Sequence, residues 1–215
     1  GPSEERRHRV VQIARRHNLP IIEDDAYGLL PTHRPPALAA LAPELTYYLC
    51  GFSKSLGAGL RIAYLALPSA RLRSRLAVTL RATTVMASPI TAALASCWVQ
   101  DGTADLALTL TRRESQARQE LVAEILAGAD YRSHPEAFHV WLRMPPAWSR
   151  VAFAARLRAQ GINVVVSDAF AVNGKPPEAV RLCLGGPASR QDLGHALHVI
   201  ADALQQPGAA SAGFF

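Results

Sequence analysis

Short apolar runs and helical patterns alternate along the first seventy or so residues of the chain. Residues 3–18 place apolar positions at helical spacing among charged ones, which predicts an amphipathic helix with Ser3 at its N-cap. Runs of β-branched and aromatic residues predict strands over 20–24, 46–52 and 62–67, and a proline-rich loop joins the first two. The connection between the last two strands holds about ten residues, which is shorter than a parallel crossover usually needs. We therefore expect these two strands to run antiparallel.

From residue 69 onward the pattern is helical, with breaks expected near Ser88-Pro89 and around Asp101-Gly102. A long helix over 103–127 is predicted to end at Gly128. After this helix, predicted strands and helices alternate in a pattern typical of an α+β domain. Its predicted elements are a strand over 137–143, a helix over 149–160, strands over 162–167 and 179–184, and a helix over 189–205. We expect one domain over 1–103, a second over 104–215, and a loose tail over 208–215.

The size and composition of the chain favour an ordinary globular protein. It has 215 residues, of which 49% are hydrophobic and 19% charged, enough to bury a substantial core. We find no apolar run of the roughly 18 residues that a membrane span needs. The N-terminus opens on charged residues with no apolar signal segment, so we expect a soluble, cytoplasmic protein.

The net charge of +6 raises the question of a nucleic-acid surface. The basic residues are scattered among acidic ones, with no stripe of alternating aromatic and basic residues, which favours a solvated surface instead. Cys50, Cys97 and Cys183 lie far apart without metal-ligand spacing. Buried, reduced thiols are therefore expected rather than a disulfide framework or a zinc site.

Lysine is scarce, and only Lys54 and Lys175 are present. Lys54 lies in the segment GFSKSLGAGLR, directly after a predicted strand. A lysine that acts as a nucleophile must hold an uncharged amine in a preorganised place, and a strand-end loop of small residues provides one. Lys175 is flanked by Gly174 and Pro176, which is typical of an exposed loop lysine. Chemistry that needs a lysine amine would therefore use Lys54.

The residues around Lys54 suit a pyridine cofactor that carries a phosphate. The carboxylate of Asp24 ends a predicted strand, where it could stabilise a protonated pyridine nitrogen, and the Tyr27 phenol could reach the ring oxygen. A capped strand end with a packed tyrosine is the alternative for this pair. Ser53, Ser55 and Arg61 bring hydroxyls and a planar cation that could bind a phosphate dianion, although an arginine alone is more often structural.

Arg181 stands on the otherwise apolar strand predicted over 179–184. A charged side chain in such a setting needs a partner. The partner could be the carboxylate of a small molecule, gripped by two hydrogen bonds, or the carboxylate of a buried structural ion pair. The spacing does not choose between the two.

Several segments resemble a known family. IIEDDAYG, YYLCGFSKSLGAGLRIAYLALP and PPEAVRLCLGGP are similar to class I/II aminotransferases of fold type I. The similarity also covers MASPITAALASCWVQDGTAD, HVWLRMP and VVVSDAFAV, and it is strongest to the aminotransferase-like domains of MocR-type regulators of the GntR group. It implies an α/β fold, with part of a large domain built on a mixed, mostly parallel sheet and a small C-terminal α+β domain. It also implies that the first half of the family's domain lies outside this chain.

The resemblance implies pyridoxal 5'-phosphate as the cofactor and a role for each candidate residue. These roles are Asp24 to the pyridine nitrogen, Tyr27 to the ring oxygen, Lys54 as the Schiff-base lysine, Ser53 and Arg61 to the phosphate, and Arg181 to the substrate carboxylate. One position departs from the pattern: Gly51 stands where many relatives carry a Ser or Thr that also binds the phosphate. Phosphate binding is therefore expected to be weaker, or to depend on Ser53.

Three functions are compatible with this reading. The first is the effector-sensing domain of a MocR/GntR-type transcriptional regulator, which would bind DNA only through an upstream domain. The second is a free-standing aminotransferase that transfers an amino group to a 2-oxo acid, and the third is a scaffold with an inactive site. In the first two, the partners implied are an amino acid or 2-oxo acid and a second copy of the chain. Whether the site turns over as an enzyme stays open.

Overall fold

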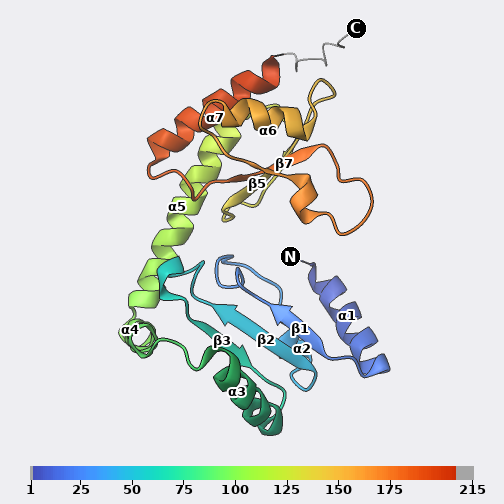
Figure 1. The fold of residues 1–215 in the computed structure, drawn as a ribbon, viewed down its shortest axis with the longest axis vertical. Coiled ribbons are helices and arrows are strands. Elements are labelled where there is room, and N and C mark those ends of the chain that lie inside the picture. The colour runs from blue at the N-terminus through green and yellow to red at the C-terminus, as the bar shows by residue number, and fades with distance from the viewer. Residues whose placement is uncertain (1, 207–215) are drawn as a thin grey trace. The chain divides into compact units, whose positions relative to one another are not determined.

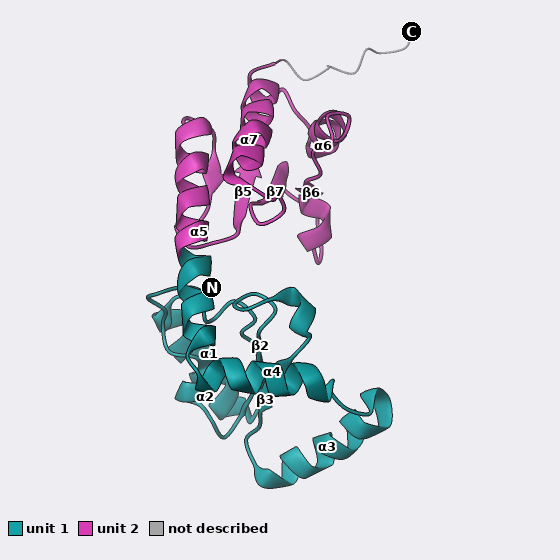
Figure 2. Ribbon diagram, turned by 90° about the vertical axis from the view of Figure 1, so that its left-hand side faces the viewer, with its two compact units in different colours: residues 1–112 teal, residues 113–215 magenta. Residues whose placement is uncertain are grey.

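The structure is a computed structural model that describes residues 2–206. The chain divides into two compact units, residues 1–112 and 113–215 (Figure 2). The division falls within the long helix α5, Thr103–Ile125, whereas the sequence-based boundary lies at the start of that helix. The tail expected over 208–215 lies outside the described residues.

The first unit begins with helix α1, Glu4–His17. Its N-cap is Ser3, whose hydroxyl accepts a hydrogen bond from the backbone amide of Arg6, and it ends at Asn18 in the left-handed conformation. Acidic residues occupy its first turn and basic residues its last, in line with the helix dipole. The predicted helix and its N-cap are confirmed.

A three-stranded mixed sheet forms the centre of this unit (Figure 1). Its strands, in spatial order, are β1 (Ile21–Asp24), β2 (Thr46–Gly51) and β3 (Ala63–Ala66). β1 runs parallel to β2, while β2 and β3 are antiparallel, as predicted. The end of β1, the end of β2 and the start of β3 therefore lie at one edge of the sheet.

The loop between β1 and β2 contains a short helix, α2 (Leu38–Leu41), that the proline-rich pattern does not predict. The carboxylate of Glu23 accepts hydrogen bonds from the backbone amides of Leu38 and Ala39, at 3.0 and 2.9 Å. A residue of β1 thus satisfies the first amides of a helix far along the chain. Expecting only a loop here was wrong, because the stabilising contact is not local in sequence.

Three helices complete the first unit and lead out of it. They are α3 (Ala70–Thr84), α4 (Pro89–Gln100) and α5. The predicted breaks are confirmed: Pro89 occupies the first turn of α4, and Gly102, just before α5, has a φ of 83°. Several apolar side chains on these helices are exposed, among them Ile90 at 80%.

The second unit is an antiparallel four-stranded sheet whose spatial order is β4-β5-β7-β6. Its strands are β4 (Tyr131–Arg132), β5 (His139–Arg143), β6 (Val165–Val166) and β7 (Ala179–Cys183). Helices α6 (Arg150–Arg158) and α7 (Arg190–Gln205) pack with the end of α5 on one face (Figure 1). The shared core includes Val122, Leu142, Phe153, Val180 and Leu197. The predicted α+β unit is confirmed.

Two details of this sheet differ from the prediction. The strand expected over 162–167 shortens to β6, because the chain turns into a 3-10 helix, η2 (Ser167–Phe170). The buried Ser167 hydroxyl donates a 2.6 Å hydrogen bond to the carbonyl of Pro177 and so holds the chain at that turn. β4 is too short, at two residues, for a periodic pattern to indicate it.

The cysteine thiols are free. The expectation that they are buried was wrong, because Cys97 and Cys183 are exposed and Cys50 is half-buried. Cys97 lies on α4, and Cys183 is the last residue of β7, between the buried Leu182 and Leu184, so its side chain lies on the other face of the sheet from theirs. Among residues 2–206, no helix combines the length and the apolar character needed to cross a bilayer.

Candidate active site

The turn that carries Lys54 is held by one backbone carbonyl. The oxygen of Phe52 accepts hydrogen bonds from the amides of Ser55, Leu56 and Gly57, at 3.3, 2.9 and 3.1 Å. The amide of Phe52 donates to the carbonyl of Ile62, and the Phe52 ring is buried in a small core with Ile62. Lys54 itself is exposed. An accessible amine thus stands on a firmly anchored turn.

The turn after β1 brings Tyr27 to Lys54. The Lys54 Nζ atom lies 5.6 Å from the centre of the Tyr27 ring, within the range of a cation–π contact. The two residues come from separate turns at the same edge of the sheet, after β1 and after β2. This pairing is the one that the sequence suggests, in which the phenol and the amine serve the same site.

Asp24 is the last residue of β1, and its register partner on β2 is Leu49. Its side chain is exposed, and its Oδ1 atom accepts a 3.2 Å hydrogen bond from the amide of Ala26. The carboxylate therefore caps the local turn through Oδ1. It stands at the sheet edge that also carries Lys54.

The candidate phosphate ligands follow Lys54 or adjoin it. Ser53 is half-buried, and Arg61 is exposed, with a φ of 52° just after the 3-10 helix η1 (Ala58–Leu60). Within the described residues, Arg61 forms no ion pair with a carboxylate. The Ser55 hydroxyl is buried and finds no hydrogen-bond partner among those residues. A buried hydroxyl and an unpaired guanidinium fit an anionic group such as a phosphate.

Arg181 lies in the second unit, on β7, opposite Trp141 of β5 and Val165 of β6. Its guanidinium carbon is 4.8 Å from the centre of the Phe170 ring, and Phe170 meets Trp141 edge to face. The Nε atom is buried without a hydrogen-bond partner, and no carboxylate of residues 2–206 forms an ion pair with Arg181. Among the described residues, Arg181 therefore does not form the structural ion pair that was one of its two possible roles. An unsatisfied guanidinium of this kind suits an external carboxylate.

Phe170 is held in place by contacts that the sequence does not indicate. It belongs to η2, in which Asp168 accepts hydrogen bonds from two nitrogens of Arg150, one of them at 2.9 Å. Arg150 also donates a 2.6 Å hydrogen bond to Glu178. The hydrogen bonds from Arg150 lower the pKa of Asp168, so that carboxylate stays charged. The ring beside Arg181 is thereby fixed through an ion-pair cluster.

Asp25 is a further residue that the sequence analysis passes over. Its carboxylate is bound by the side chains of Tyr48 and Arg34. The sequence does contain a signal for this turn, because Asp25 and Gly28 stand at its first and fourth positions, where Asp and Gly are typical of a type I turn. The turn would place a carboxylate beside Tyr27, but its two distant partners cannot be found from local spacing.

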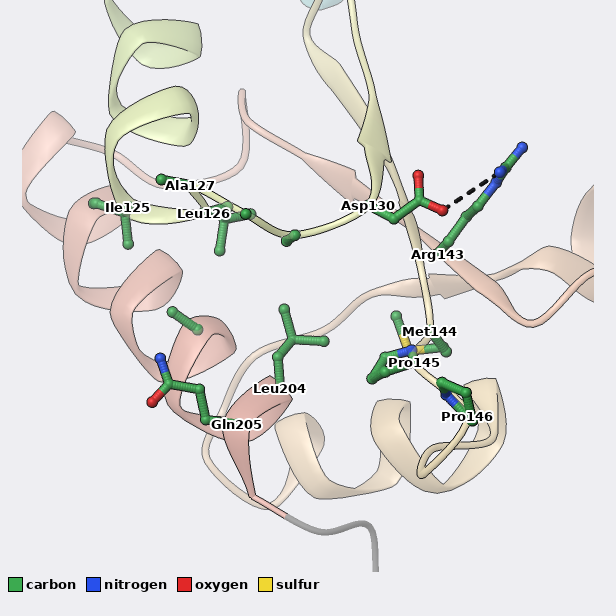
Figure 3. A pocket seen from close by; sticks show the side chains of 13 residues that line it. Ile125, Leu126, Ala127, Asp130, Arg143, Met144, Pro145, Pro146, Leu204 and Gln205 are labelled. Atoms are coloured by element: carbon green, nitrogen blue, oxygen red, sulfur yellow. Dashed lines mark hydrogen bonds and ion pairs between the residues drawn. The ribbon is translucent and has the colours of Figure 1, made fainter.

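A separate groove of about 540 Å³ lies in the second unit, between the ends of α5 and α7 and the segment after β5 (Figure 3). Its lining is mainly apolar, with Leu126, Met144 and Leu204, and the Asp130–Arg143 pair lies at its margin. None of the candidate residues lines this groove. Among the described residues, no group of three or more His, Cys, Asp or Glu side chains is placed to hold a metal ion.

Comparison with known proteins gives matches along almost the whole chain. The family model for aminotransferase class I and II matches residues 2–200. The chain is 29% identical, over 199 residues, to the uncharacterized HTH-type transcriptional regulator YdeF of Bacillus subtilis (strain 168), covering 92% of this chain and 43% of that protein. It is 31% identical, over 188 residues, to the uncharacterized HTH-type transcriptional regulator YisV of the same organism, covering 84% and 38%. The chain thus spans less than half of the length of either relative.

The fold also has counterparts among solved structures. An archaeal alanine:glyoxylate aminotransferase superposes with a TM-score of 0.81 at 24% identity, covering 94% of this chain and 52% of that one. At this level of identity the likeness concerns the fold alone. The chain thus has part of an aminotransferase fold of type I.

Proposed function

Because the chain belongs to the class I and II aminotransferase family, we propose that it is the effector-sensing, pyridoxal-phosphate-binding domain of a transcriptional regulator of the MocR/GntR type. Two relatives named as HTH-type transcriptional regulators support the regulatory part of the proposal. This chain spans less than half of those proteins, and we propose that a DNA-binding module lies upstream of it in the complete protein. The described residues support the cofactor part.

The first unit offers the groups that pyridoxal phosphate needs. When bound, this cofactor withdraws electrons from the bonds at the Cα atom of an amino acid. Asp24 would pair with its protonated ring nitrogen, Tyr27 would donate to its ring oxygen, and the Lys54 amine would attach it covalently. Ser53 and Arg61 would bind its phosphate, and the Ser55 hydroxyl, which has no hydrogen-bond partner among the described residues, would donate a further hydrogen bond to that phosphate.

Arg181 would bind the carboxylate of the effector, an amino acid or a 2-oxo acid. A buried Nε atom without a partner is costly unless a ligand completes its hydrogen bonding. The Phe170 ring covers the guanidinium, which favours a carboxylate that approaches in the guanidinium plane. We further propose that the complete protein is a cytoplasmic homodimer, and the exposed apolar side chains of α3 and α4 support such an association.

The observation that carries the proposal is the 5.6 Å contact between the Lys54 amine and the Tyr27 ring, at the sheet edge where Asp24 ends β1. The test is reduction with borohydride in the presence of pyridoxal phosphate, followed by peptide mapping. The chain has two lysines, so Lys175 serves as an internal control. We expect the label on Lys54, its loss in Lys54→Arg and its retention in Lys175→Arg. Label on Lys175, or on neither lysine, would contradict the proposal.

A catalytic aminotransferase is the second candidate, because Asp24, Tyr27 and Lys54 are all present in the chain and the Lys54 amine contacts the Tyr27 ring. In that case Lys54, once released from its covalent bond to the cofactor, would act as the base that removes the proton from the Cα atom of the amino acid. The amino group would then pass to a 2-oxo acid. Steady production of 2-oxo acid by the complete protein would favour this function. Binding of an amino acid with at most one turnover would favour the sensor.

A further inference from the structure

The carboxylate of Asp25 links the turn after β1 to the middle of the sheet. Its Oδ2 atom accepts a 2.7 Å hydrogen bond from the hydroxyl of Tyr48, on the central strand β2, and a 2.9 Å hydrogen bond from Arg34. The Asp25 side chain is only 14% exposed. Burial, and then the hydrogen bond to Asp25, raise the pKa of Tyr48, so its phenol remains a donor. We call Asp25, Tyr48 and Arg34 the Asp25 clamp.

The backbone of Asp25 is fixed as well. Its amide donates to the carbonyl of Leu49 at 2.9 Å, which extends the pairing of β1 with β2 by one residue. Its carbonyl accepts from the amide of Gly28 at 3.0 Å, and the Tyr27 carbonyl accepts from Leu30 at 3.1 Å. The short turn that carries Tyr27 thus starts from a residue held at both its main chain and its side chain.

The far end of the turn is tied down separately. Arg112 of α5 donates to the carbonyls of Leu29 and Leu30, each at 2.7 Å. With Asp25 fixed at one end and these carbonyls at the other, little of the turn is left to move. The position of the Tyr27 ring therefore depends on both anchors, and the Asp25 clamp is the anchor at the end of the turn nearest β1.

Gly28 packs directly against the Asp25 carboxylate. A Cβ atom at position 28 would lie 2.0 Å from Oδ2 of Asp25. Gly28 does not have a positive φ, so its backbone conformation does not require a glycine. The glycine is required because the Asp25 carboxylate lies so close to it. Any side chain at this position would push the carboxylate away from Tyr48 and Arg34. Substituting Gly28 is thus a way to open the clamp without removing any of its members.

We propose that Asp25 is a positioning residue for the site: its carboxylate, held by Tyr48 and Arg34, fixes the turn that keeps the Tyr27 ring against the Lys54 amine. The proposal rests on the proposed function of Lys54 and Tyr27. Asp25 touches neither a ligand nor the amine, and it acts through the placement of Tyr27. The clamp thus assigns a role to Asp25, which directly follows Asp24 in the chain.

The scarcity of lysine allows a direct test on the chain without cofactor. Reductive methylation with 13C-formaldehyde gives one NMR signal each for Lys54, Lys175 and the N-terminal amine. The Tyr27 ring, 5.6 Å from the amine, should shift the Lys54 signal by its ring current, and Tyr27→Leu defines the position of that signal without the ring. We expect Asp25→Asn and Gly28→Ala to move the Lys54 signal at least halfway to that value, while the Lys175 signal stays in place.

Matched variants complete the test. Tyr48→Phe removes one hydrogen bond of the clamp and should shift the Lys54 signal in the same direction, whereas Tyr47→Phe, on the neighbouring position of β2, should not. Asp105→Asn, at an exposed position of α5, controls for loss of a negative charge. Should Asp25→Asn fail to fold, Tyr48→Phe decides the outcome.

The outcomes separate the two proposals. A Lys54 signal that stays at its wild-type position in Tyr48→Phe and in every folded Asp25 or Gly28 variant, while Tyr27→Leu moves it, would overturn the positioning role. That result would leave the borohydride experiment untouched. Conversely, a signal that moves as expected, in a chain whose Lys54 takes no label, would support the clamp and reject the cofactor proposal.

Discussion

The Nη1 atom of Arg7 on α1 lies 2.8 Å from the Oε1 atom of Glu23 on β1, and the two side chains are only 13% and 7% exposed. The same carboxylate receives the first amides of α2. One buried ion pair therefore joins two helices and a strand that are separated in sequence. The first unit depends on it because a buried carboxylate without its cation would be left largely uncompensated.

Arg7→Met should lower the free energy of unfolding by about 3–5 kcal/mol, since it leaves the Glu23 charge buried without a counter-ion. Urea unfolding followed by circular dichroism measures the change. Arg15→Met is the matched control, because Arg15 and Glu44 pair at the same distance of 2.8 Å with both side chains about half exposed. Equal effects of the two substitutions would show that burial of the first pair is unimportant.

Glu114 gives the second unit a pH-dependent stability. Hydrogen bonds from Arg190 and from Arg118 lower the pKa of Glu114 to about 2. The stabilisation is complete above the usual pKa of a glutamate, near 4.5, and is lost as the pH falls from there toward 2. We expect Glu114→Gln to be less stable than the wild type at pH 7, and the difference to shrink steadily between about pH 5 and pH 2. A difference that is constant over this range would contradict the assignment.

Substitution by methionine should affect stability strongly at Arg118 and little at Arg181. Arg118 donates to the carbonyls of Leu184 and Pro187, so Arg118→Met should cost about 3 kcal/mol of unfolding free energy. Arg181→Met removes a buried nitrogen without a partner and should change stability by less than about 1 kcal/mol.

The same Arg181→Met variant should bind amino acids about tenfold more weakly or worse, because the bidentate contact to the carboxylate is gone. Titration with a panel of amino acids, followed by the absorbance of the bound cofactor in the complete protein, measures the loss. If instead the substitution strongly destabilised the second unit while the folded protein bound amino acids as tightly as the wild type, Arg181 would be a structural residue.

Gly51 can be tested as the position where the chain departs from its family. A Cβ atom there would meet the Cβ atom of Ala63 and the carbonyl of Ile62 at 3.6 Å, an ordinary contact, so the glycine is not sterically required. Gly51→Ser adds a hydroxyl three residues before Lys54, and we expect about fivefold tighter binding of pyridoxal phosphate. Gly51→Ala adds the same Cβ atom without the hydroxyl and should bind as the wild type does. Spectroscopic titration with the cofactor distinguishes the two.

Local patterns were enough to predict most of the elements. The capped helix at Ser3, the antiparallel pair of β2 and β3, and the breaks at Pro89 and Gly102 all follow from rules that act within a few residues. The resemblance to class I/II aminotransferases is confirmed by the family match, and with it the incomplete type I fold. These predictions succeed because each signal and its effect lie close together in the chain.

The features that the sequence analysis missed depend on partners far apart in the chain. Helix α2 needs Glu23, the Asp25 clamp needs Tyr48, and the ring beside Arg181 needs Arg150 to hold Asp168. Tertiary contacts of this kind override local propensity, and spacing alone cannot reveal them. The roles of the candidate site residues, by contrast, remain predictions that the experiments above address.

A single carbonyl oxygen, that of Phe52, accepts hydrogen bonds from three amides of the turn that carries Lys54. Since this acceptor is part of the main chain, no substitution of a neighbouring side chain can delete it. Only a proline at one of the donor positions would take a bond away. Substitution of the Ser55 or Leu56 side chain by any residue other than proline would therefore change the surroundings of the Lys54 amine and keep the three hydrogen bonds that hold the turn. The turn can thus acquire new specificities without losing its backbone conformation.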